Sequence, residues 1–518
     1  MLTSRADVTL ATLSGVLLAL SFPKFGHPAF AWVALTPLVV ALSGATLRRA
    51  FLLGLTSGII YFTGTLYWIT RVMAVYGGLQ TWVAVLINAA LIAYLALFPA
   101  LFALCTRQIT MRYGQAALTA APVVWVASEL GRTYLFSGFP WVLLGYSQAT
   151  VLPIAQLASV FGVFGVSMLV AAVSTTFAMA VGGPAEVLLS RAPRPAKTGR
   201  YVRYAPAAVA MAVVLVVAVW GGRRAAASEL IRNGEPLRVG IIQGNVDQAE
   251  KWDVSRASSI FQDHVRMTRQ AIGEGAEVVI WPESSTPFLF EEDLPDASKI
   301  RTLAEQAHVG ILLGSDQIER GRPDKFYNSA FLVRSDGTTA GVYRKMHLVP
   351  FGEYVPLQRL LFFAAPLTEQ VGTFSPGITA TILPLDGHKV SVAICYEVIY
   401  PELVRQFVEG GSELLTTITN DAWFGDTSAP VQHFQQASMR AIENGRYLVR
   451  AANTGISGIV DPYGRVVEQT AVFQPAVLVG EARYLRESTF YARHGDILAY
   501  ASAVATAVFV VVARRRVK

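Results

Sequence analysis

Charged residues are scarce in this sequence. Asp, Glu, Lys and Arg make up 15% of its 518 residues, whereas hydrophobic residues make up 53%. That balance is too apolar for an ordinary soluble protein. Long stretches with almost no charge fill residues 8–220 and return near 496–513, while residues 225–490 have the composition of a soluble domain. We therefore expect a membrane helix bundle, a globular domain and one closing span.

The sequence also lacks the patterns of several ligand-binding classes. Its seven histidines are scattered with no pair at metal-ligand spacing, so we expect no metal site, and we predict no cofactor. The net charge of +7 comes largely from Lys and Arg at the ends of apolar stretches, not from a basic face with interleaved aromatics, so we expect no nucleic-acid binding. No cleavage site follows the first apolar stretch, which we interpret as a retained span.

The membrane-spanning stretches can be counted from their length. A helix that crosses the hydrocarbon core needs about 20 mostly apolar residues. Eight stretches approach this length, at roughly 7–22, 28–44, 50–70, 80–105, 115–131, 156–182, 204–221 and 496–513. The first two are short and could instead form a re-entrant hairpin. This would change the number of spans but keep it even. We divide the chain into a transmembrane bundle (1–222), an exported domain (223–490), and a last span with a basic tail (491–518).

The basic residues in short loops predict the orientation, because Lys and Arg resist translocation. One set of alternate loops carries Arg5, Arg48, Arg49, Arg107, Arg112 and the basic clusters within 191–203 and 514–518. The other set carries only Lys24, Arg71, Arg132, Arg223 and Arg224. We therefore expect both termini in the cytoplasm and the domain of residues 223–490 on the exported side.

Cysteine is rare as well, and only Cys105 and Cys395 occur in the chain. They are predicted to lie on opposite sides of the membrane, so no intrachain disulfide can join them. Cys395 is then a lone thiol in a compartment expected to be oxidising. A single cysteine is more often a small buried hydrophobe than a nucleophile, so its neighbours must decide its role.

The exported domain alternates short apolar runs with helical stretches. Each run ends in a polar cluster, as buried strands do when they carry functional groups at their C-terminal ends. The runs are LRVGIIQGN (237–245), EVVIWPE (277–283), VGILLGSDQ (309–317), KVSVAICYE (389–397) and LLTTITND (414–421). Helices are predicted over about 254–273, 400–409 and 430–446, and hairpins around 335–337 and 461–464. The pattern predicts an α/β sandwich with a mixed sheet.

Three reactive side chains follow predicted strands. Glu283 closes EVVIWPE, Lys345 follows GVYR, and Cys395 follows SVAI. Because ligands gather at the carboxyl ends of strands in such sheets, we expect these side chains to meet. Glu283 can take the thiol proton of Cys395, and Lys345 can hold the negative charge that develops on a carbonyl oxygen. The backbone N–H of Tyr396 is a second candidate donor to that oxygen.

Four motifs in this order resemble those of the nitrilase superfamily. They are WPES (281–284), YRKMHLVPFGEYVP (343–356), ICYE (394–397) and NDAWFG (420–425). The resemblance implies an αββα sandwich with a Glu-Lys-Cys triad. Glu353 matches a second glutamate of the family, which we expect to orient Lys345 or relay protons, although a loop salt bridge is an alternative. Glu397 matches the family's C-Y-E motif and is expected to support the turn after Cys395.

The membrane half of the sequence narrows the resemblance from the nitrilase superfamily to one family. A nitrilase-like domain inserted between the seventh and eighth transmembrane helices is similar to the apolipoprotein N-acyltransferases, over nearly the whole chain. FSGFPWVLLGYSQ (136–148) looks like that family's membrane-surface motif. The resemblance implies transfer of a fatty acyl chain from a phospholipid, such as phosphatidylethanolamine, through a thioester on Cys395. The acceptor would be the α-amino group of the N-terminal diacylglyceryl-cysteine of an apolipoprotein, at the exported face of a bacterial inner membrane.

Both of these substrates are lipids, so we expect a site that opens toward membrane lipid and shields the thioester from water. Loop aromatic residues are candidates for this cover, namely Trp252, Trp423, Phe362 and Phe363. Gln243 and Asn328 are candidates for positioning substrate, although polar residues at strand ends often only satisfy the backbone. We expect a monomer.

Two other functions stay open. A membrane-tethered amidase of the nitrilase type would use the same triad, but small substrates require no bundle of eight spans. A transporter or scaffold with an inactive domain would account for the charges of Glu129 and Arg132 within a predicted span. It would leave the motifs around the three reactive residues unexplained.

Overall fold

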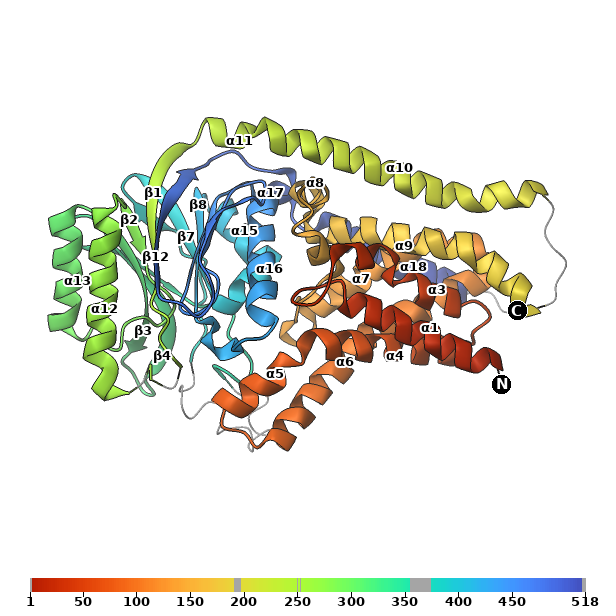
Figure 1. The fold of residues 1–518 in the computed structure, drawn as a ribbon, viewed down its shortest axis with the longest axis horizontal. Helices are drawn as coiled ribbons and strands as arrows, with labels where there is room; N and C mark the ends of the chain where they lie inside the picture. The colour runs from red at the N-terminus through yellow and green to blue at the C-terminus, as the bar shows by residue number, and fades with distance from the viewer. Residues whose placement is uncertain (1, 191–196, 249, 252, 355–373, 515–518) are drawn as a thin grey trace. The chain divides into compact units, whose positions relative to one another are not determined.

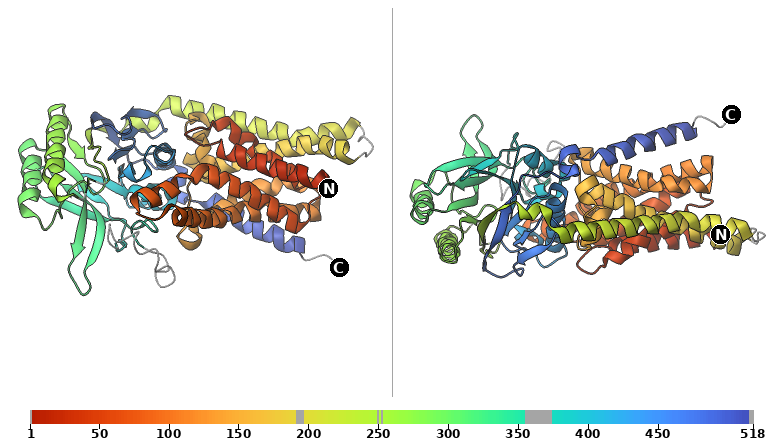
Figure 2. Two further views of the ribbon diagram at one scale, coloured as in Figure 1. Left: turned by 60° about the horizontal axis from the view of Figure 1, so that its bottom comes forward. Right: turned by 90° about the horizontal axis from the view of Figure 1, so that it is seen from above.

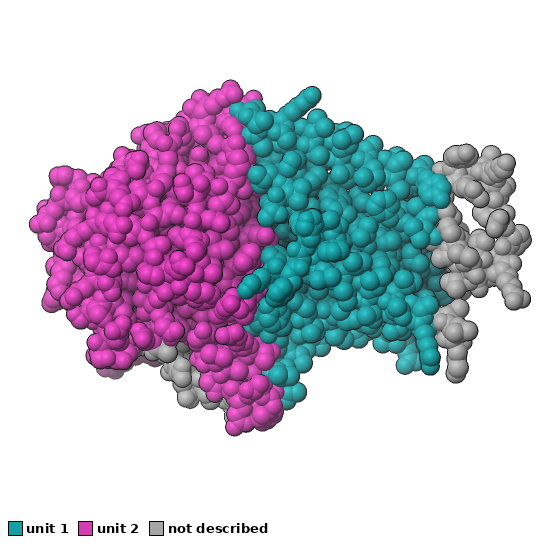
Figure 3. Space-filling model, viewed as in Figure 1, with its two compact units in different colours: residues 1–68, 85–227, 494–518 teal, residues 69–84, 228–493 magenta. Residues whose placement is uncertain are grey.

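The computed structural model describes residues 2–190, 197–248, 250–251, 253–354 and 374–514. The chain forms two compact units, which are coloured separately in Figure 3. The first comprises residues 1–68, 85–227 and 494–518, and the second comprises residues 69–84 and 228–493. A short segment from the apolar half of the sequence therefore belongs to the second unit.

The first unit consists of helices in the part of it that is described. The long ones are α1 (Leu2–Ala19), α4 (Leu47–Leu66), α6 (Thr81–Tyr113), α7 (Ala121–Tyr134), α9 (Ala158–Ser190), α10 (Lys197–Ala227) and α18 (Ile497–Arg514) (Figure 1). The connections between them contain short helices: η1 (Pro28–Phe30), α2 (Ala31–Ala34), α3 (Thr36–Ala41), η3 (Gln115–Ala120), η4 (Leu135–Ser137), η5 (Leu144–Gln148) and α8 (Leu152–Ala155). Small residues bring helices close, because a Cβ on Gly54 would lie 2.5 Å from the carbonyl oxygen of Pro99 on α6.

Five helices in the described ranges have the length and composition to cross a membrane. They are Leu47–Leu66, Thr81–Tyr113, Ala158–Val181, Tyr204–Arg232 and Ile497–Arg514. The predicted stretches near 7–22, 28–44 and 115–131 correspond to α1, to the broken run Pro28–Ala41 and to η3 with α7, which do not reach the same length and hydropathy. Several apolar helices that could span a membrane are thus present, and the count of eight stays a prediction.

Two buried charges on α7 hold the segment that follows this helix. Arg132 donates to the backbone carbonyl oxygen of Trp141 at 2.6 Å, and Glu129 accepts the backbone N–H of Leu144 at 2.7 Å. Phe136, near the start of the same segment, is 87% exposed. The two charges satisfy backbone groups of the predicted membrane-surface motif. They therefore give no support to a transport pathway.

The second unit is built on two six-stranded sheets (Figures 1 and 2). The first has the order β12 (Ala476–Tyr484), β1 (Glu235–Gln243), β2 (Val278–Ile280), β3 (Gly310–Glu319), β4 (Lys325–Val333) and β5 (Thr339–Arg344). The second has the order β11 (Val466–Gln469), β10 (Gly458–Val460), β9 (Leu448–Ala452), β8 (Leu414–Thr419), β7 (His388–Ile394) and β6 (Leu383–Leu385). Pairing is parallel among β1, β2 and β3 and among β7, β8 and β9, and antiparallel elsewhere.

Helices cover the outer face of each sheet, so this unit has four layers. Helices α12 (Val254–Gly273) and α13 (Leu294–Ala307) pack on the first sheet, and α15 (Pro401–Glu409) and α16 (Ala429–Asn444) pack on the second (Figure 1). The other helices among the described residues of this unit are short: α5 (Trp68–Arg71), η2 (Val72–Tyr76), α11 (Glu229–Arg232), η7 (Cys395–Ile399), η8 (Asp421–Phe424) and α17 (Phe490–His494). The arrangement is the αββα sandwich that the motifs imply.

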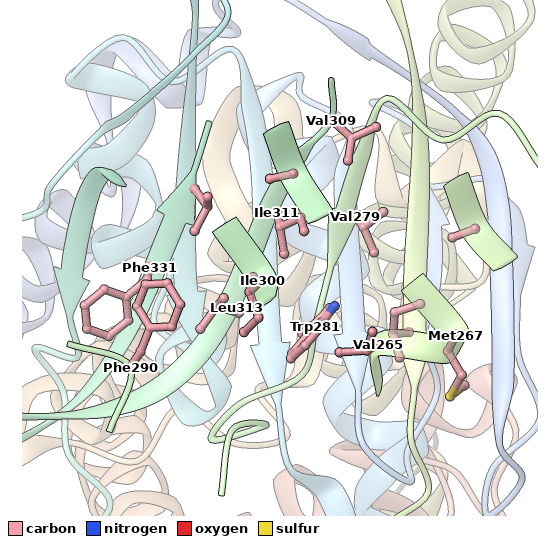
Figure 4. Close-up of a cluster of buried hydrophobic side chains, with 14 of the residues drawn as sticks. Val265, Met267, Val279, Trp281, Phe290, Ile300, Val309, Ile311, Leu313 and Phe331 are labelled. Atoms are coloured by element: carbon pink, nitrogen blue, oxygen red, sulfur yellow. The ribbon is translucent and has the colours of Figure 1, made fainter. Parts of the chain in front are cut away.

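An apolar core lies between the first sheet and its two helices (Figure 4). Trp281 has no exposed surface, and its indole N–H donates to the hydroxyl of Thr268 on α12 at 2.8 Å. Its ring packs against Phe261 of the same helix. Burial of a large aromatic ring contributes about 2–3 kcal/mol, so Trp281 anchors the chain two residues before Glu283.

The strands, helices and hairpins predicted for the domain of residues 223–490 are confirmed, with boundary shifts of a few residues. The hairpin at 335–337 joins β4 and β5, and that at 461–464 joins β10 and β11. The strands divide between two sheets, as an αββα sandwich requires, and each sheet is mixed. The strands β6, β9 and β12 were not predicted, although β12 pairs with β1 along its whole length.

Candidate active site

Four strand ends converge on one site in the second unit. Glu283 lies three residues beyond β2, Lys345 directly follows β5, Cys395 directly follows β7, and Asn420 directly follows β8. The two β-sheets contribute two of these residues each. The site is therefore formed where the edges of both sheets meet, as the strand-end argument predicts.

Lys345 is bound between two carboxylates. Its Nζ lies 3.3 Å from Oε1 of Glu283 and 2.9 Å from Oε1 of Glu353. The lysine is 1% exposed, so water does not solvate its charge. Burial by itself would lower the pKa of Lys345, but the charges of Glu353 and Glu283 raise it well above its ordinary value. Lys345 is an ammonium ion, and the predicted Glu353–Lys345 contact is present.

The Glu283 carboxylate is held by two further groups besides Lys345. The amide Nδ2 of Asn328 donates to its Oε1 at 2.7 Å and also to Oε1 of Glu353 at 2.9 Å. The backbone N–H of Asn420 donates to its Oε2 at 2.8 Å. Burial would raise the pKa of Glu283, but these contacts and the nearby lysines hold it below the ordinary value. The carboxylate form is favoured, as a proton acceptor requires.

Gly314 on β3 makes room for the segment that carries Glu283. A Cβ at this position would lie 2.6 Å from the carbonyl oxygen of Pro282 and 2.6 Å from the backbone nitrogen of Ser284. Real Cβ atoms do not approach backbone atoms so closely, so the absence of a side chain allows the segment to cross the strand.

Cys395 lies at a sharp turn between β7 and η7. Its φ is +53°, a conformation that non-glycine residues rarely adopt. The residue is 9% exposed. Burial and the charge of Glu283 raise the pKa of the Cys395 thiol, and Lys345 opposes this. The resting group is therefore a thiol beside a carboxylate, and its proton leaves as the sulfur attacks a substrate.

Glu397 joins the Cys395 turn to the strand end that carries Lys345. Its Oε1 accepts the Tyr343 hydroxyl at 2.7 Å and the backbone N–H groups of Met346 at 2.6 Å and His347 at 3.0 Å. Its Oε2 accepts the backbone N–H of Ile394 at 2.7 Å. Burial raises its pKa from 4.5 to about 7, although the hydrogen bonds from Ile394, His347 and Tyr343 and the charge of Lys345 oppose the rise.

Tyr396 belongs to an aromatic cluster beside the turn. Its ring centroid lies 5.9 Å from that of His347 and 5.3 Å from that of Tyr400. Burial, and next Lys345, lower the pKa of His347 to about 4, so the imidazole is neutral. The ring centroid of His347 lies 3.8 Å from that of Tyr400, so this side chain packs within the aromatic cluster.

Lys251 is a second buried lysine that sequence analysis missed. Its Nζ donates to the backbone carbonyl oxygen of Glu283 at 3.1 Å. It lines a cavity together with Glu283, His264, Ser284, Thr286 and Asn453. Burial lowers its pKa, whereas the charges of Glu283, Asp316 and Cys395 raise it. The sequence offered one signal for this residue: Lys251 directly precedes Trp252, which was a candidate for the cover of the site.

The candidate substrate-binding residues have different outcomes. Asn328 lies in the site, but it contacts the two glutamates. Gln243 has no exposed surface, and its amide bonds to Ala471, Gln474, Ser457 and Thr470. Its predicted contact with substrate is therefore corrected to a structural role, because all its hydrogen-bonding capacity is used within the fold.

The aromatic candidates lie partly outside the described residues. Trp423 is half-buried, and its ring meets that of Tyr76 edge-on at 5.8 Å. Tyr76 comes from the 69–84 segment, so this segment contributes an aromatic neighbour to the NDAWFG motif. Trp252, Phe362 and Phe363 lie outside the described residues.

Comparisons with known sequences match both halves of the chain. Residues 238–484 match the carbon-nitrogen hydrolase family, and residues 14–176 match the apolipoprotein N-acyltransferase N-terminal domain. An apolipoprotein N-acyltransferase from Geobacter metallireducens is 41% identical over 99% of this chain and 96% of its own length. Those from Methylococcus capsulatus and Pasteurella multocida are 35% and 33% identical, over 94% and 95% of this chain and 92% of each relative.

Solved structures of the nitrilase superfamily resemble about half of the chain. An amidase of the nitrilase superfamily from Nesterenkonia is 19% identical with a TM-score of 0.39, over 52% of this chain and 98% of its own. A nitrilase-superfamily protein from Saccharomyces cerevisiae is 21% identical with a TM-score of 0.38, over 48% and 90%. The family assignment rests on the sequence matches, which extend over both the apolar bundle and the sandwich with its Glu, Lys and Cys strand ends. Because they cover nearly the whole chain at up to 41% identity, this protein belongs to the apolipoprotein N-acyltransferase family.

Proposed function

We propose that this protein transfers a fatty acyl chain from a phospholipid to the N-terminal diacylglyceryl-cysteine of apolipoproteins, with Cys395 as the temporary carrier. The observation that carries the proposal is the buried Lys345 ammonium between Glu283 and Glu353, next to a thiol on a strained turn. A carboxylate, an ammonium group and a thiol are the groups that acyl transfer through a thioester requires.

In the first half-reaction the Cys395 sulfur attacks an ester carbonyl of the phospholipid. Glu283 takes the thiol proton as the C–S bond forms, and the carbonyl oxygen becomes an oxyanion. Lys345 has three N–H groups for two carboxylate neighbours, so one can donate to this oxyanion, and the backbone N–H of Tyr396 is the second donor. Collapse breaks the C–O bond, and the departing lysophospholipid oxygen receives the proton from Glu283.

In the second half-reaction the α-amino group of the apolipoprotein attacks the thioester. Glu283 accepts a proton from the attacking nitrogen, Lys345 again stabilises the oxyanion, and the C–S bond breaks. The proton returns to the sulfur, so Cys395 is a thiol at the end of the cycle. Glu353 holds Lys345 throughout, and Glu397 holds the turn; neither is consumed.

The lipid substrates favour a site on the exported side of a bacterial inner membrane. We propose that both termini are cytoplasmic and that the chain acts as a monomer on phosphatidylethanolamine or a related donor. A single cysteine at the 88% exposed Val254, in a chain lacking Cys105 and Cys395, should react with a membrane-impermeant maleimide in intact spheroplasts. Val517→Cys in the same background should react only after lysis, and the reverse pattern would exclude this orientation.

The reaction itself is tested with phosphatidylethanolamine that carries a labelled acyl chain. The purified protein should acquire a label that hydroxylamine removes, because thioesters are cleaved by this nucleophile. Cys395→Ala should abolish the label, whereas Cys105→Ala, which removes the other cysteine, should retain it. Addition of a diacylated lipopeptide should move the label to the peptide's amino group.

The alternatives give different results in the same experiment. An amidase would hydrolyse a small amide and place no label on the lipopeptide. An inactive scaffold would take no label in either cysteine variant. A label that survives in Cys395→Ala would show that Cys395 is not the carrier.

A further inference from the structure

A buried ionic cluster lies beneath the Cys395 turn and has no part in the reaction described above. Asp421 begins η8, His433 lies on α16, and Arg450 lies on β9. The side chains of all three have no exposed surface. Nη2 of Arg450 lies 2.8 Å from Oδ2 of Asp421, so the buried charges balance.

His433 connects this cluster to the backbone of the nucleophile. Its Nε2 lies 3.2 Å from the carbonyl oxygen of Cys395, which can only accept, so Nε2 carries the hydrogen. Its Nδ1 lies 3.0 Å from Nη2 of Arg450, which can only donate, and 3.1 Å from Oδ1 of Asp421, which can only accept. Burial and the charge of Arg450 lower the pKa of His433. The shorter contact and the lowered pKa favour an Nδ1 that accepts from Arg450. A neutral imidazole with hydrogen on Nε2 therefore accepts from Arg450 and donates to Cys395.

Thr419 connects the same cluster to the side chain of the nucleophile. Its hydroxyl donates to Oδ1 of Asp421 at 2.8 Å, and it is also a hydrogen-bond partner of the Cys395 side chain. A hydroxyl has one hydrogen, so while it donates to Asp421 its oxygen can accept from the thiol. When the thiol ionises, rotation of the hydroxyl supplies a donor to the sulfur.

The fold makes room for the carboxylate at the centre of the cluster. A Cβ on Gly455 would lie 2.2 Å from Oδ2 of Asp421 and 2.7 Å from its Cβ. Only glycine leaves this space, so the position of Asp421 depends on a residue of the β9–β10 connection. Asp421 thereby accepts from Thr419 of β8 and from Arg450 of β9, and Arg450 in turn donates to His433 of α16.

We infer that Asp421 is a positioning residue that holds Cys395 at two points: at its side chain through Thr419, and at its carbonyl oxygen through Arg450 and His433. The two contacts lie on either side of the Cα atom and oppose rotation of a residue whose φ is +53°. The inference rests on the proposed role of Cys395 as acyl carrier. The cluster makes it possible to keep the strained turn while the sulfur changes from thiol to thiolate to thioester.

The test measures alkylation of Cys395 by iodoacetamide as a function of pH, in Cys105→Ala protein without lipid substrate. Thr419→Val removes the hydroxyl and should slow alkylation about tenfold at pH 8, with the midpoint moved about one unit higher. Thr419→Ser retains the hydroxyl and should stay within about twofold. The other titratable neighbours, Glu283, Lys345, Lys251, Asp421 and Tyr396, are the same in both variants.

His433 is tested by acyl-label formation on Cys395. His433→Leu removes the donor to the carbonyl oxygen and should reduce the rate about tenfold or more, whereas His433→Gln, which can donate from Nε2, should recover at least half of the loss on a logarithmic scale. Thermal unfolding in detergent identifies variants that fail to fold. If a His433 variant fails to fold, the comparison of Thr419→Val with Thr419→Ser decides the inference alone.

Equal alkylation profiles for Thr419→Val and Thr419→Ser would overturn the inference. Equal acyl-labelling losses for folded His433→Leu and His433→Gln would overturn it as well, since a merely structural role would not distinguish them. Alkylation needs no acyl donor. A protein that alkylates as expected but never transfers an acyl chain would therefore contradict the proposed function and leave the positioning role intact.

Discussion

The substitution Glu397→Gln tests whether the Cys395 turn and the Lys345 strand end are held as one piece. The carboxylate accepts four hydrogen bonds, three on Oε1 and one on Oε2. A glutamine oxygen can keep the three, but its NH₂ group then faces the backbone N–H of Ile394. The variant loses one charge-assisted bond and leaves a buried donor unpaired, which costs about 2–3 kcal/mol.

If the lost free energy displaces the sulfur, the activation free energy of its attack rises by the same amount. Acyl-label formation on Cys395 should then fall about 30- to 150-fold. Tyr343→Phe removes one of the four donors and serves as the graded control. It should cost about 1 kcal/mol, or about fivefold. The assay is the rate of hydroxylamine-sensitive labelling under single-turnover conditions. A Glu397→Gln rate within about threefold of the unmodified protein would refute the argument.

The pH dependence of Glu397 has opposite signs for activity and stability. Its pKa is raised in the folded state, from 4.5 to about 7. Between these values the folded state binds more protons than the unfolded state, so the contribution of this group to stability falls as pH rises. The carboxylate that accepts all four bonds forms over the same range. Labelling should therefore increase through pH 7, and Glu397→Gln should remove this part of the profile.

Three further substitutions probe the surroundings of Glu283. Gly314→Ala places a Cβ 2.6 Å from backbone atoms of residues 282 and 284 and should slow acyl labelling about tenfold or more. The control Gly273→Ala, whose Cβ would have no atom within 4 Å, should not slow labelling. Equal rates for the two variants would show that Gly314 is not needed to make room for the Glu283 segment. Asn328→Leu removes a donor from Glu283, so its pKa rises and the acid limb of the labelling profile should move upward by about one unit. Lys251→Met removes a positive charge and should raise the pH midpoint of Cys395 alkylation by about half a unit; an unchanged midpoint would show that its charge does not reach the thiol.

Local sequence patterns were sufficient for several parts of this protein. Apolar length predicts the long helices, and short apolar runs with polar ends predict strands β1, β2, β3, β7 and β8. Glu283, Lys345 and Cys395 could be chosen because each follows such a run, and the four motifs placed them in a family. These features depend on residues near one another in the chain.

Other parts depend on pairing between distant segments, which local patterns do not contain. Asn420 donates to Glu283 across 137 residues of chain, and Thr470 donates to Gln243 across 227. Gln243 was assigned to substrate because a polar residue at a strand end looks the same whether it faces a ligand or a neighbouring loop. The membership of the 69–84 segment in the second unit is likewise a matter of packing.

The sequence alone determined which residues have the chemistry for acyl transfer and in what order they occur, because strand ends and polar motifs are local. The tertiary structure alone decided how that chemistry is held. It bound Lys345 between two carboxylates, joined the strand end to the turn through Glu397, and placed the Asp421 cluster beneath Cys395. The physical reason is that a buried charge must find its partners in space, and the order of strands in two sheets determines which partners are within reach.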